Sequence, residues 1–197
     1  MATFTFFTNP MSRGQIARWA LHEAGVDYET VLVDWQAKPE ALLAANPMGK
    51  VPTIVHHAAD GDHAVSEAAA ICLYLADVSP LEALTPQDTE RAAYLRWTFF
   101  AAGPVEQAIT ARSLGFEPKG QQQGMAGFGS YELAVDTLAG HFAQNDYVCG
   151  DRFTMADVYV GSQVDWGLSF KTLPERPEFV AYAERFRSRP AYVEAKG

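Results

Sequence analysis

The first residue that could do chemistry is a serine near the start of the chain. Ser12 follows residues 3–7, a short apolar and β-branched segment typical of a strand, and a helical pattern begins at the serine itself. Two interpretations fit. Ser12 can cap the helix in a capping box with Gln15. Alternatively, its hydroxyl can donate a hydrogen bond to an anion at the helix N-terminus, which favours negative charge.

A second candidate opens the helix expected at residues 66–78. In one interpretation Ser66 is the N-cap, and Glu67 lies in the first turn, where a carboxylate suits the helix dipole. In the other, Glu67 receives the ammonium of a ligand, while the free N–H groups of Glu67 and Ala68 hold its carboxylate. An α-amino acid head group carries both charges.

A third candidate is the loop Asn46–Pro52, which contains two prolines and a glycine before the strand expected at residues 53–57. Pro52 is either a plain loop proline or a cis proline in a tight bend. In the second case the backbone of Val51 would face outward and could pair with an extended, peptide-like ligand.

Other conspicuous residues favour structural roles. Thr154 and Asp157 fit a capping box in which aspartate replaces glutamate, and Phe153 and Val158 are placed for a hydrophobic staple. Residues 94–100 are aromatic-rich and typical of a core. His56, His57 and His63 lie close in sequence, but adjacent residues on a strand point to opposite faces, so we expect no metal site.

The elements that must position these residues change character near residue 79. Up to residue 78, strand and helix signals alternate in the order β-α-β-α-β-β-α, which predicts a mixed sheet with helices packed on it. Residues 79–88, with Pro80 and Pro86, are typical of a linker. Residues 89–197 are almost entirely helical in pattern.

Composition excludes several classes of protein. The 197 residues include 15 Lys+Arg and 24 Asp+Glu, a net charge of -9, which argues against nucleic-acid binding and against docking on anionic membranes. Two separate cysteines, Cys72 and Cys149, indicate neither a disulfide scaffold nor a zinc site. We see no signal peptide, and the most apolar stretch, residues 68–76, is too short to cross a bilayer. A cytoplasmic location is therefore expected.

Together, four segments resemble the cytosolic glutathione S-transferases of bacterial type. They are Ser12 after the first strand, Asn46-Pro47-Met48-Gly49-Lys50-Val51-Pro52, Ser66-Glu67-Ala68-Ala69-Ala70-Ile71, and Gly150-Asp151-Arg152-Phe153-Thr154-Met155-Ala156-Asp157. The resemblance covers essentially the whole chain. It implies a thioredoxin-like α/β domain at residues 1–78, a linker at 79–88, an all-α domain at 89–197, and a homodimer.

The resemblance also implies roles for single residues. Glutathione would be the cosubstrate, and no metal is implied. Its cysteinyl part would pair with the backbone of Val51 before Pro52, with Lys50 beside it to help with ligand charge. Glu67 would bind the γ-glutamyl ammonium. The next position is usually a serine that holds the γ-glutamyl carboxylate, but this chain has Ala68.

The thiol activator in the family is a Tyr, Ser or Cys near the end of the first strand. This chain offers only Thr8, Asn9 and Ser12 there, and Ser12 fits the serine pattern best. The expected reaction is attack of the thiolate on a small hydrophobic electrophile, or a related isomerase, peroxidase or dehalogenase reaction. The electrophile would lie between the domains, near Tyr94, Trp97 and Trp166.

Two rival hypotheses remain. The same fold could be a catalytically weak module that binds glutathione, another ligand or a protein. A disulfide oxidoreductase is disfavoured because no cysteine lies near residue 12. The identity of the electrophile, the effect of Ala68 on affinity and the physiological role cannot be predicted from the sequence.

Overall fold

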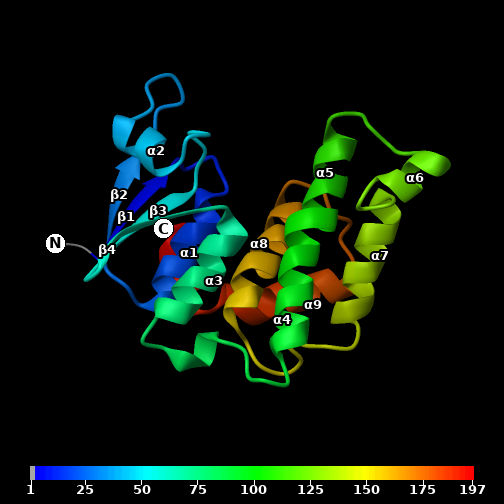
Figure 1. Cartoon of the computed structure of the whole chain (residues 1–197). Coiled ribbons are helices and arrows are strands. Elements are labelled where there is room, and N and C mark those ends of the chain that lie inside the picture. The colour runs from blue at the N-terminus through cyan, green and yellow to red at the C-terminus, as the bar shows by residue number, and fades with distance from the viewer. Residues whose placement is uncertain (1–2) are drawn as a thin grey trace. The chain divides into compact units, whose positions relative to one another are not determined.

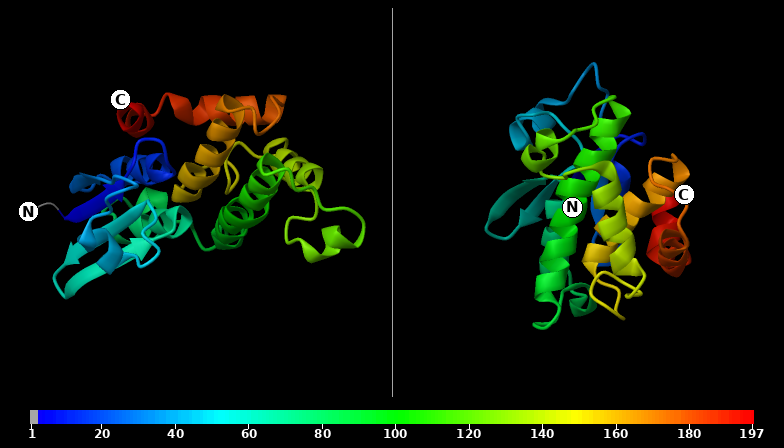
Figure 2. Two further views of the ribbon diagram at one scale, coloured as in Figure 1. Left: turned by 90° about the horizontal axis from the view of Figure 1, so that it is seen from above. Right: turned by 90° about the vertical axis from the view of Figure 1, so that its right-hand side faces the viewer.

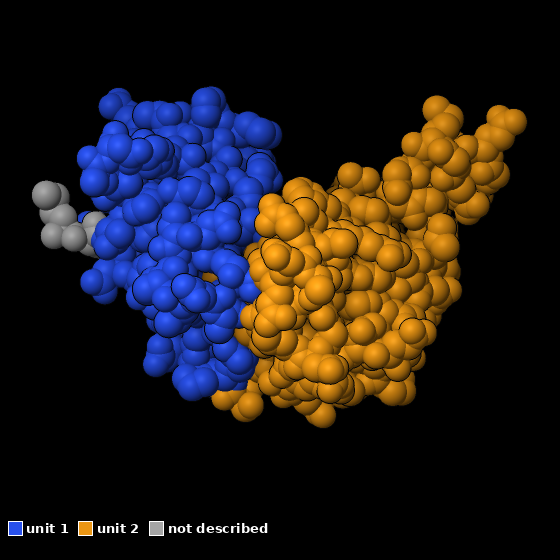
Figure 3. All heavy atoms as spheres, turned by 60° about the horizontal axis from the view of Figure 1, so that its bottom comes forward, with its two compact units in different colours: residues 1–85, 189–197 blue, residues 86–188 orange. Residues whose placement is uncertain are grey.

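The computed structural model describes residues 3–197, which form ten α-helices, two shorter helical segments and four strands. Figure 1 labels most of these elements, and Figure 2 gives two further views. The chain forms two compact units (Figure 3). The first contains the described residues up to Thr85 together with Arg189–Gly197, and the second contains Pro86–Ser188. The sequence predicted that everything from residue 89 onward belongs to the helical domain, but the C-terminal segment packs with the first unit.

The first unit is built on a four-stranded mixed sheet with the strand order β2-β1-β3-β4. Strand β1 runs parallel to β2 and antiparallel to β3, and β3 runs antiparallel to β4. This confirms the mixed sheet expected from the alternating pattern. The strands are β1 (Phe4–Thr8), β2 (Tyr28–Leu32), β3 (Thr53–Ala58) and β4 (Gly61–Ser66).

Strand β1 at the centre of this sheet has buried apolar residues on both of its faces. Phe4 and Phe6 are almost fully buried, and Phe7, on the other face of β1, packs in a cluster with Leu42 of α2. Helix α1 ends at Gly25, whose φ of 62° suits a glycine after a helix. The helices of this unit are α1 (Gly14–Ala24), α2 (Glu40–Ala45), α3 (Ala68–Val78), the 3-10 helix η1 (Glu82–Leu84) and α10 (Pro190–Lys196).

Helix α10 is held on α1 by an ion pair between a partly exposed arginine at its N-cap and a buried glutamate. Arg189 donates to both carboxylate oxygens of Glu23, at 2.7 and 2.8 Å, and the indole N–H of Trp19 donates to the same carboxylate at 3.0 Å. The ring of Tyr192 packs edge-on against Trp19. Because the carboxylate is buried with donors around it, these contacts explain why the C-terminal segment belongs to the first unit.

The second unit is a helical bundle around α8, whose side chains are mostly buried. A π-helical segment containing Pro104 joins α4 to α5, so the helical stretch is locally widened at this point and continues through it. The elements are α4 (Arg91–Phe100), η2 (Ala101–Val105), α5 (Glu106–Ser113), α6 (Gln121–Met125), α7 (Tyr131–Phe142), α8 (Met155–Ser169) and α9 (Pro177–Arg187). Among residues 3–197, no helix combines the length and apolarity needed to cross a membrane.

Candidate active site

The register of the sheet brings three of the sequence motifs together at one end of the strands, which we call the site edge. Thr53, at the start of β3, pairs with Phe7 near the end of β1 and with Ser66 at the end of β4. The residues next to these three in the chain therefore lie at the same end of the sheet. They are Thr8, Pro52 and Glu67.

Ser12 is engaged in local hydrogen bonds at this edge. Its Oγ donates to the carbonyl of Asn9 at 2.6 Å and accepts from the N–H of Gly14 at 3.0 Å. Helix α1 begins at Gly14, and the side chain of Gln15 donates to the carbonyl of Pro10. The predicted capping box between Ser12 and Gln15 is therefore wrong: the serine hydroxyl closes the turn before the helix instead.

Thr8 offers a different hydroxyl at the end of β1. Its side chain is almost buried, with 8% of the residue exposed, and it lies against the first residue of α1. A Cβ atom at Gly14 would stand 1.9 Å from Thr8 Oγ1, so only glycine allows this approach. Within residues 3–197 the Thr8 hydroxyl makes no hydrogen bond. It is thus an available donor beside a helix N-terminus.

The loop before β3 is held by buried polar contacts. The Val51–Pro52 peptide bond is cis, which is one of the two alternatives left open by the sequence. The side-chain amide of Asn46 donates to the Lys50 carbonyl at 3.2 Å and to Thr53 Oγ1 at 3.1 Å, and Thr53 donates to the same carbonyl. In the described part of the chain, the main chain of Val51 forms no hydrogen bond, so it is available to a ligand.

Sequence reasoning missed Lys38, which precedes α2. Its Nζ would lie 3.0 Å from a Cβ built at Gly49, so the Lys38 ammonium lies beside the loop that contains Lys50. Among the described residues neither lysine forms an ion pair. No sequence signal marks Lys38, because its position depends on how residues 33–39 fold against residues 46–52.

The start of α3 differs from the expectation. Ser66 is the last residue of β4 and not the helix N-cap, which is Glu67. Glu67 has a φ of 69°, uncommon for a residue with a side chain, and its carboxylate makes no capping hydrogen bond. The first helical bond runs from Ile71 N–H to the Glu67 carbonyl. The N–H groups of the preceding residues, beginning with Ala68, are therefore unpaired within the helix.

The predicted capping box at the start of α8 is present. Asp157 is fully buried and accepts hydrogen bonds from Val148 N–H at 2.7 Å, Thr154 N–H at 2.8 Å, Tyr182 hydroxyl at 3.0 Å and Thr154 hydroxyl at 3.2 Å. Burial raises the pKa of Asp157 to about 6, against the effect of these hydrogen bonds. Every contact of this carboxylate is internal, as a structural role requires.

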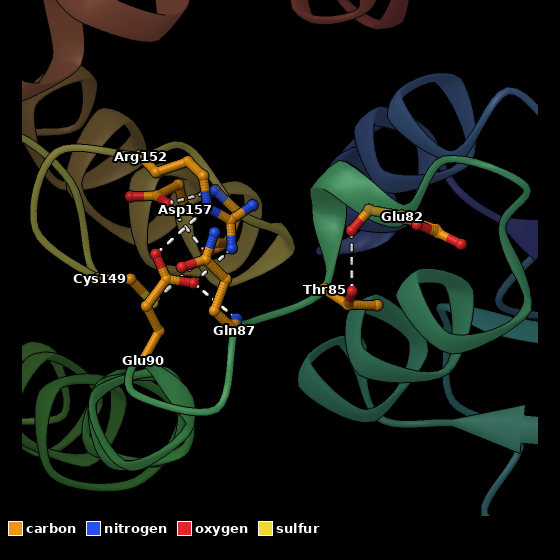
Figure 4. A network of polar contacts seen from close by, with 8 residues as sticks. Glu82, Thr85, Gln87, Glu90, Cys149, Arg152 and Asp157 are labelled. Carbon is orange, nitrogen blue, oxygen red and sulfur yellow. Dashed lines mark hydrogen bonds and ion pairs between the residues drawn. The ribbon is translucent and has the colours of Figure 1, made fainter.

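Figure 4 shows an ion pair between Arg152 and Glu90 near Asp157 in the helical unit. Arg152 donates to both carboxylate oxygens of Glu90, and the Glu90 carboxylate also accepts from Gln87 N–H at 2.7 Å. The hydrogen bonds from Arg152 hold the pKa of Glu90 below its usual range. Burial raises the pKa of the nearby Cys149 thiol to about 11, so this cysteine is not a thiolate at neutral pH.

The three aromatic residues expected near the electrophile lie in different surroundings. Tyr94 and Trp97 are core residues of the second unit, with 5% and 7% exposed. The Trp97 ring packs on His141, with centroids 4.1 Å apart. Trp166 is half-buried against Phe170. Tyr94 and Trp97 thus offer little surface to a ligand, and a role in substrate binding stays a prediction for all three.

The histidines of the β3–β4 hairpin each have a separate partner. His57 contacts Asp62 at 2.7 Å, His63 contacts Asp60 at 2.9 Å, and His56 contacts the Tyr74 hydroxyl at 2.8 Å. Among the described residues no group of three or more His, Cys, Asp or Glu side chains is arranged to hold a metal ion.

The fold and the site together define a thioredoxin-like domain followed by a helical domain, with an open polar edge on the first. Family models for the N-terminal and C-terminal domains of glutathione S-transferases match residues 11–78 and 92–190. The chain belongs to the glutathione S-transferase family.

Individual relatives differ in activity. The chain is 30% identical over 198 residues to the disulfide-bond oxidoreductase YfcG of Escherichia coli K12, covering 94% of this chain and 91% of the relative. It is 31% identical over 166 residues to maleylacetoacetate isomerase of Rattus norvegicus, covering 78% and 73%. A sphingomonad glutathione S-transferase solved in complex with glutathione matches with a TM-score of 0.75 and 27% identity, covering 98% and 96%.

Proposed function

We propose that the protein binds glutathione at the edge formed by the ends of β1 and β4 and the start of β3, and that it stabilises the thiolate for attack on a small hydrophobic electrophile. The observation that carries this proposal is the sheet register, which places Thr8, Pro52 and Glu67 together. The sphingomonad relative bound to glutathione supports the choice of ligand. The proposal includes the homodimer that the family resemblance implies and the cytoplasmic location expected from the sequence.

Each charge of glutathione has a complementary group at this edge. The unpaired main chain of Val51 suits the cysteinyl part of the peptide. The Glu67 carboxylate suits the γ-glutamyl ammonium, and the free N–H groups at the start of α3 suit its carboxylate. Lys38, whose ammonium lies beside the loop, and Lys50, which belongs to the loop, suit the glycyl carboxylate. Ala68 provides no hydroxyl, so the backbone alone holds the γ-glutamyl carboxylate.

Catalysis requires a lower thiol pKa. A free thiol has a pKa of about 8.5, and lowering it by about 2 units takes roughly 2.7 kcal/mol of thiolate-selective stabilisation. Ser12 was the activator expected from the sequence, but its proton is already directed at the Asn9 carbonyl. Thr8 has an uncommitted hydroxyl at the N-terminus of α1. We therefore assign thiolate stabilisation to Thr8, which would donate a hydrogen bond and not act as a base.

Disulfide exchange is the second candidate function. The 30% identity to a disulfide-bond oxidoreductase favours it, although this chain has no cysteine near residue 12. The exchange needs no protein thiol: bound glutathione thiolate attacks a disulfide, forms a mixed disulfide and releases the other sulfur as a thiolate. A catalytically weak binding module remains the third candidate.

An ultraviolet titration of bound glutathione across pH tests the proposal. We expect a thiolate signal about 2 units below the free thiol in the wild type. Thr8→Val should move the bound thiol pKa upward by about one unit or more, whereas Ser12→Ala should change it less. If Ser12→Ala raises the bound thiol pKa more than Thr8→Val does, Ser12 and not Thr8 stabilises the thiolate.

Rates with a chloronitrobenzene and with a low-molecular-weight disulfide would then separate transfer from exchange. Saturable binding without an early thiolate would indicate a binding module. If glutathione does not bind at all, the proposal is wrong.

A further inference from the structure

The first unit contains an open pocket with a hydroxyl, an imidazole and a carboxylate in its wall. Its volume is about 360 Å³, and it lies between α2 and strands β1, β3 and β4 (Figure 1). The three polar side chains that line it are Thr5, His57 and Asp62. We propose that they act as nucleophile, general base and positioning carboxylate in the hydrolysis of short-chain carboxylic esters. The inference goes beyond the proposed function and does not depend on glutathione.

Strand pairing puts the three side chains on one face of the sheet. Thr5 of β1 pairs with Val55 of β3, and His57 lies two residues further along β3 on the same face. A diagonal neighbour at this spacing is within reach of a long side chain such as histidine. His57 in turn pairs directly with Asp62 of β4. The group is therefore assembled by the register of three strands.

Two hydrogen bonds join the three groups in a chain. His57 Nδ1 lies 2.7 Å from Asp62 Oδ1, and His57 Nε2 lies 2.9 Å from Thr5 Oγ1. An ionised carboxylate can only accept, so a neutral imidazole beside it carries its proton on Nδ1. Nε2 then has a free lone pair, and the Thr5 hydroxyl must donate to it. This is the direction that a base-activated nucleophile requires.

The rest of the wall suits a short acyl chain. It consists of small or apolar side chains, which are Phe7, Ala41, Ala44, Ala45, Val55 and Ala64. The three alanines belong to α2, and their small side chains leave space over the sheet that larger ones would fill. Among the described residues that line the pocket there is no lysine or arginine, so the wall favours a neutral ligand.

The proposed hydrolysis has two steps. In the first, Thr5 Oγ1 forms a bond to the carbonyl carbon of the ester while His57 Nε2 takes the hydroxyl proton. The bond to the leaving oxygen then breaks, and this oxygen takes the proton from His57. In the second, water attacks the acyl-threonine with His57 as the base, the carboxylic acid leaves, and Thr5 recovers its proton. Asp62 holds the imidazole in the required tautomer and stabilises its protonated form.

Hydrolysis of p-nitrophenyl butyrate by the full chain, without glutathione, tests this inference. We expect release of p-nitrophenolate above the rate in buffer. Thr5→Val keeps the β-branched shape but has no nucleophile, so kcat/KM should fall at least about tenfold, whereas Thr5→Ser keeps the hydroxyl and should retain most of the activity. The melting temperature of each variant checks that it is folded. Equal rates for Thr5→Val and the wild type, or no hydrolysis by the wild type, would overturn the inference.

His63 provides a matched control for the general base. It contacts Asp60 at 2.9 Å in the same hairpin, but it does not line the pocket. General-base catalysis contributes about 10²–10⁴-fold, so His57→Gln should lower kcat/KM about 100-fold while His63→Gln stays within about twofold of the wild type. Equal losses in the two variants would show that the pocket is not the site.

Asp62→Asn tests the positioning role. The asparagine amide can donate to Nδ1 of His57, which moves the imidazole proton to Nε2 and leaves Thr5 without a base. Nitrogen NMR spectroscopy of His57 reports this tautomer directly. We expect an Nδ1–H form in the wild type, an Nε2–H form in the variant, and a lower kcat in the variant. An unchanged tautomer together with an unchanged kcat would contradict the role of Asp62.

Mass spectrometry after acid quenching identifies the group that is acylated. We expect one butyryl group on the peptide that contains Thr5 in the wild type and none there in Thr5→Val. Acylation of cysteine or lysine alone would overturn the inference. Because glutathione is absent from all of these assays, a failure of the proposed function leaves the ester hydrolysis rates interpretable.

Discussion

Helices α3 and α8 begin with similar sequence signals but different N-termini. At α8, Thr154 is an extended N-cap with φ -133° and ψ 175°, and Asp157 closes the first turn. At α3, the N-cap is Glu67, with φ 69° and ψ 117°, and no side chain caps the helix. One set of backbone donors is thus satisfied internally, and the other is available to a ligand. A serine or threonine followed by an acidic residue predicts the start of a helix. The backbone conformation of the N-cap residue then decides whether that helix N-terminus stabilises the fold or is available to bind a ligand.

We call the N-terminus of α8 closed, because side chains of the protein cap it, and that of α3 open, because none does. The largest effect should come from a substitution that removes the cap of the closed N-terminus. Asp157→Ala removes the acceptor for two backbone N–H groups and the Tyr182 hydroxyl, all of them buried. Each orphaned buried donor costs about 1–3 kcal/mol, so the three together should lower the free energy of unfolding by at least about 3 kcal/mol. Urea denaturation measures it. Asp151→Ala, at an exposed acid of the same segment, is the control and should change stability by less than about 0.5 kcal/mol. A similar loss in both variants would contradict the structural role of Asp157.

The same carboxylate should make stability depend on pH. Burial raises the pKa of Asp157 to about 6 in the folded state, above its value in the unfolded chain. The folded state therefore holds this proton more tightly, and the associated stability is present below about pH 4 and lost as the pH rises to about 6. Asp157→Asn cannot titrate. The difference in unfolding free energy between wild type and Asp157→Asn should narrow over this window, by about 3 kcal/mol at most. A constant difference from pH 4 to 7 would show that the four hydrogen bonds outweigh burial.

The two N-termini also show what the sequence can predict. The alternation of strand and helix patterns predicted the order of elements and the mixed sheet, because apolar periodicity reflects burial directly. The capping box of Thr154 and Asp157 was also predicted correctly from the sequence, since it depends on residues close together in the chain. The cap of α3 was misplaced by one residue, because strand pairing with Thr53 extends β4 to Ser66. A tertiary contact therefore outweighed the local preference of serine for the N-cap.

Long-range contacts account for the other differences. Arg189 belongs with the first unit because it pairs with Glu23, a residue far away in the sequence, and neither residue has a local pattern that announces the pair. The position of Lys38 beside Gly49 depends on two loops. The choice between Thr8 and Ser12 depends on which hydroxyl already donates a hydrogen bond, and this is determined by the folded chain and not by any local pattern.

The open N-terminus should respond to mutation in the opposite way from the closed one. Glu67→Ala removes an exposed carboxylate with no capping bond, so the free energy of unfolding should change by less than about 0.5 kcal/mol. Glutathione affinity should fall about tenfold to a hundredfold, since a lost hydrogen bond to a charged group costs roughly 1.5–3 kcal/mol. Calorimetric titration with glutathione measures this loss. Unchanged affinity would exclude Glu67 from the proposed site.

The smallest effect should come from completing the open N-terminus. Ala68 is the first residue of α3 and is 7% exposed, and it lacks the hydroxyl that the family resemblance leads one to expect. Ala68→Ser would add one hydrogen bond to the γ-glutamyl carboxylate, so glutathione should bind up to about tenfold more tightly. Ala69→Ser is the control, because its hydroxyl would lie one step further around the helix. If both variants bind as the wild type does, the backbone N–H groups already satisfy the carboxylate. If Ala68→Ser weakens binding, the γ-glutamyl group does not lie against this end of α3, and the comparison of the two N-termini fails.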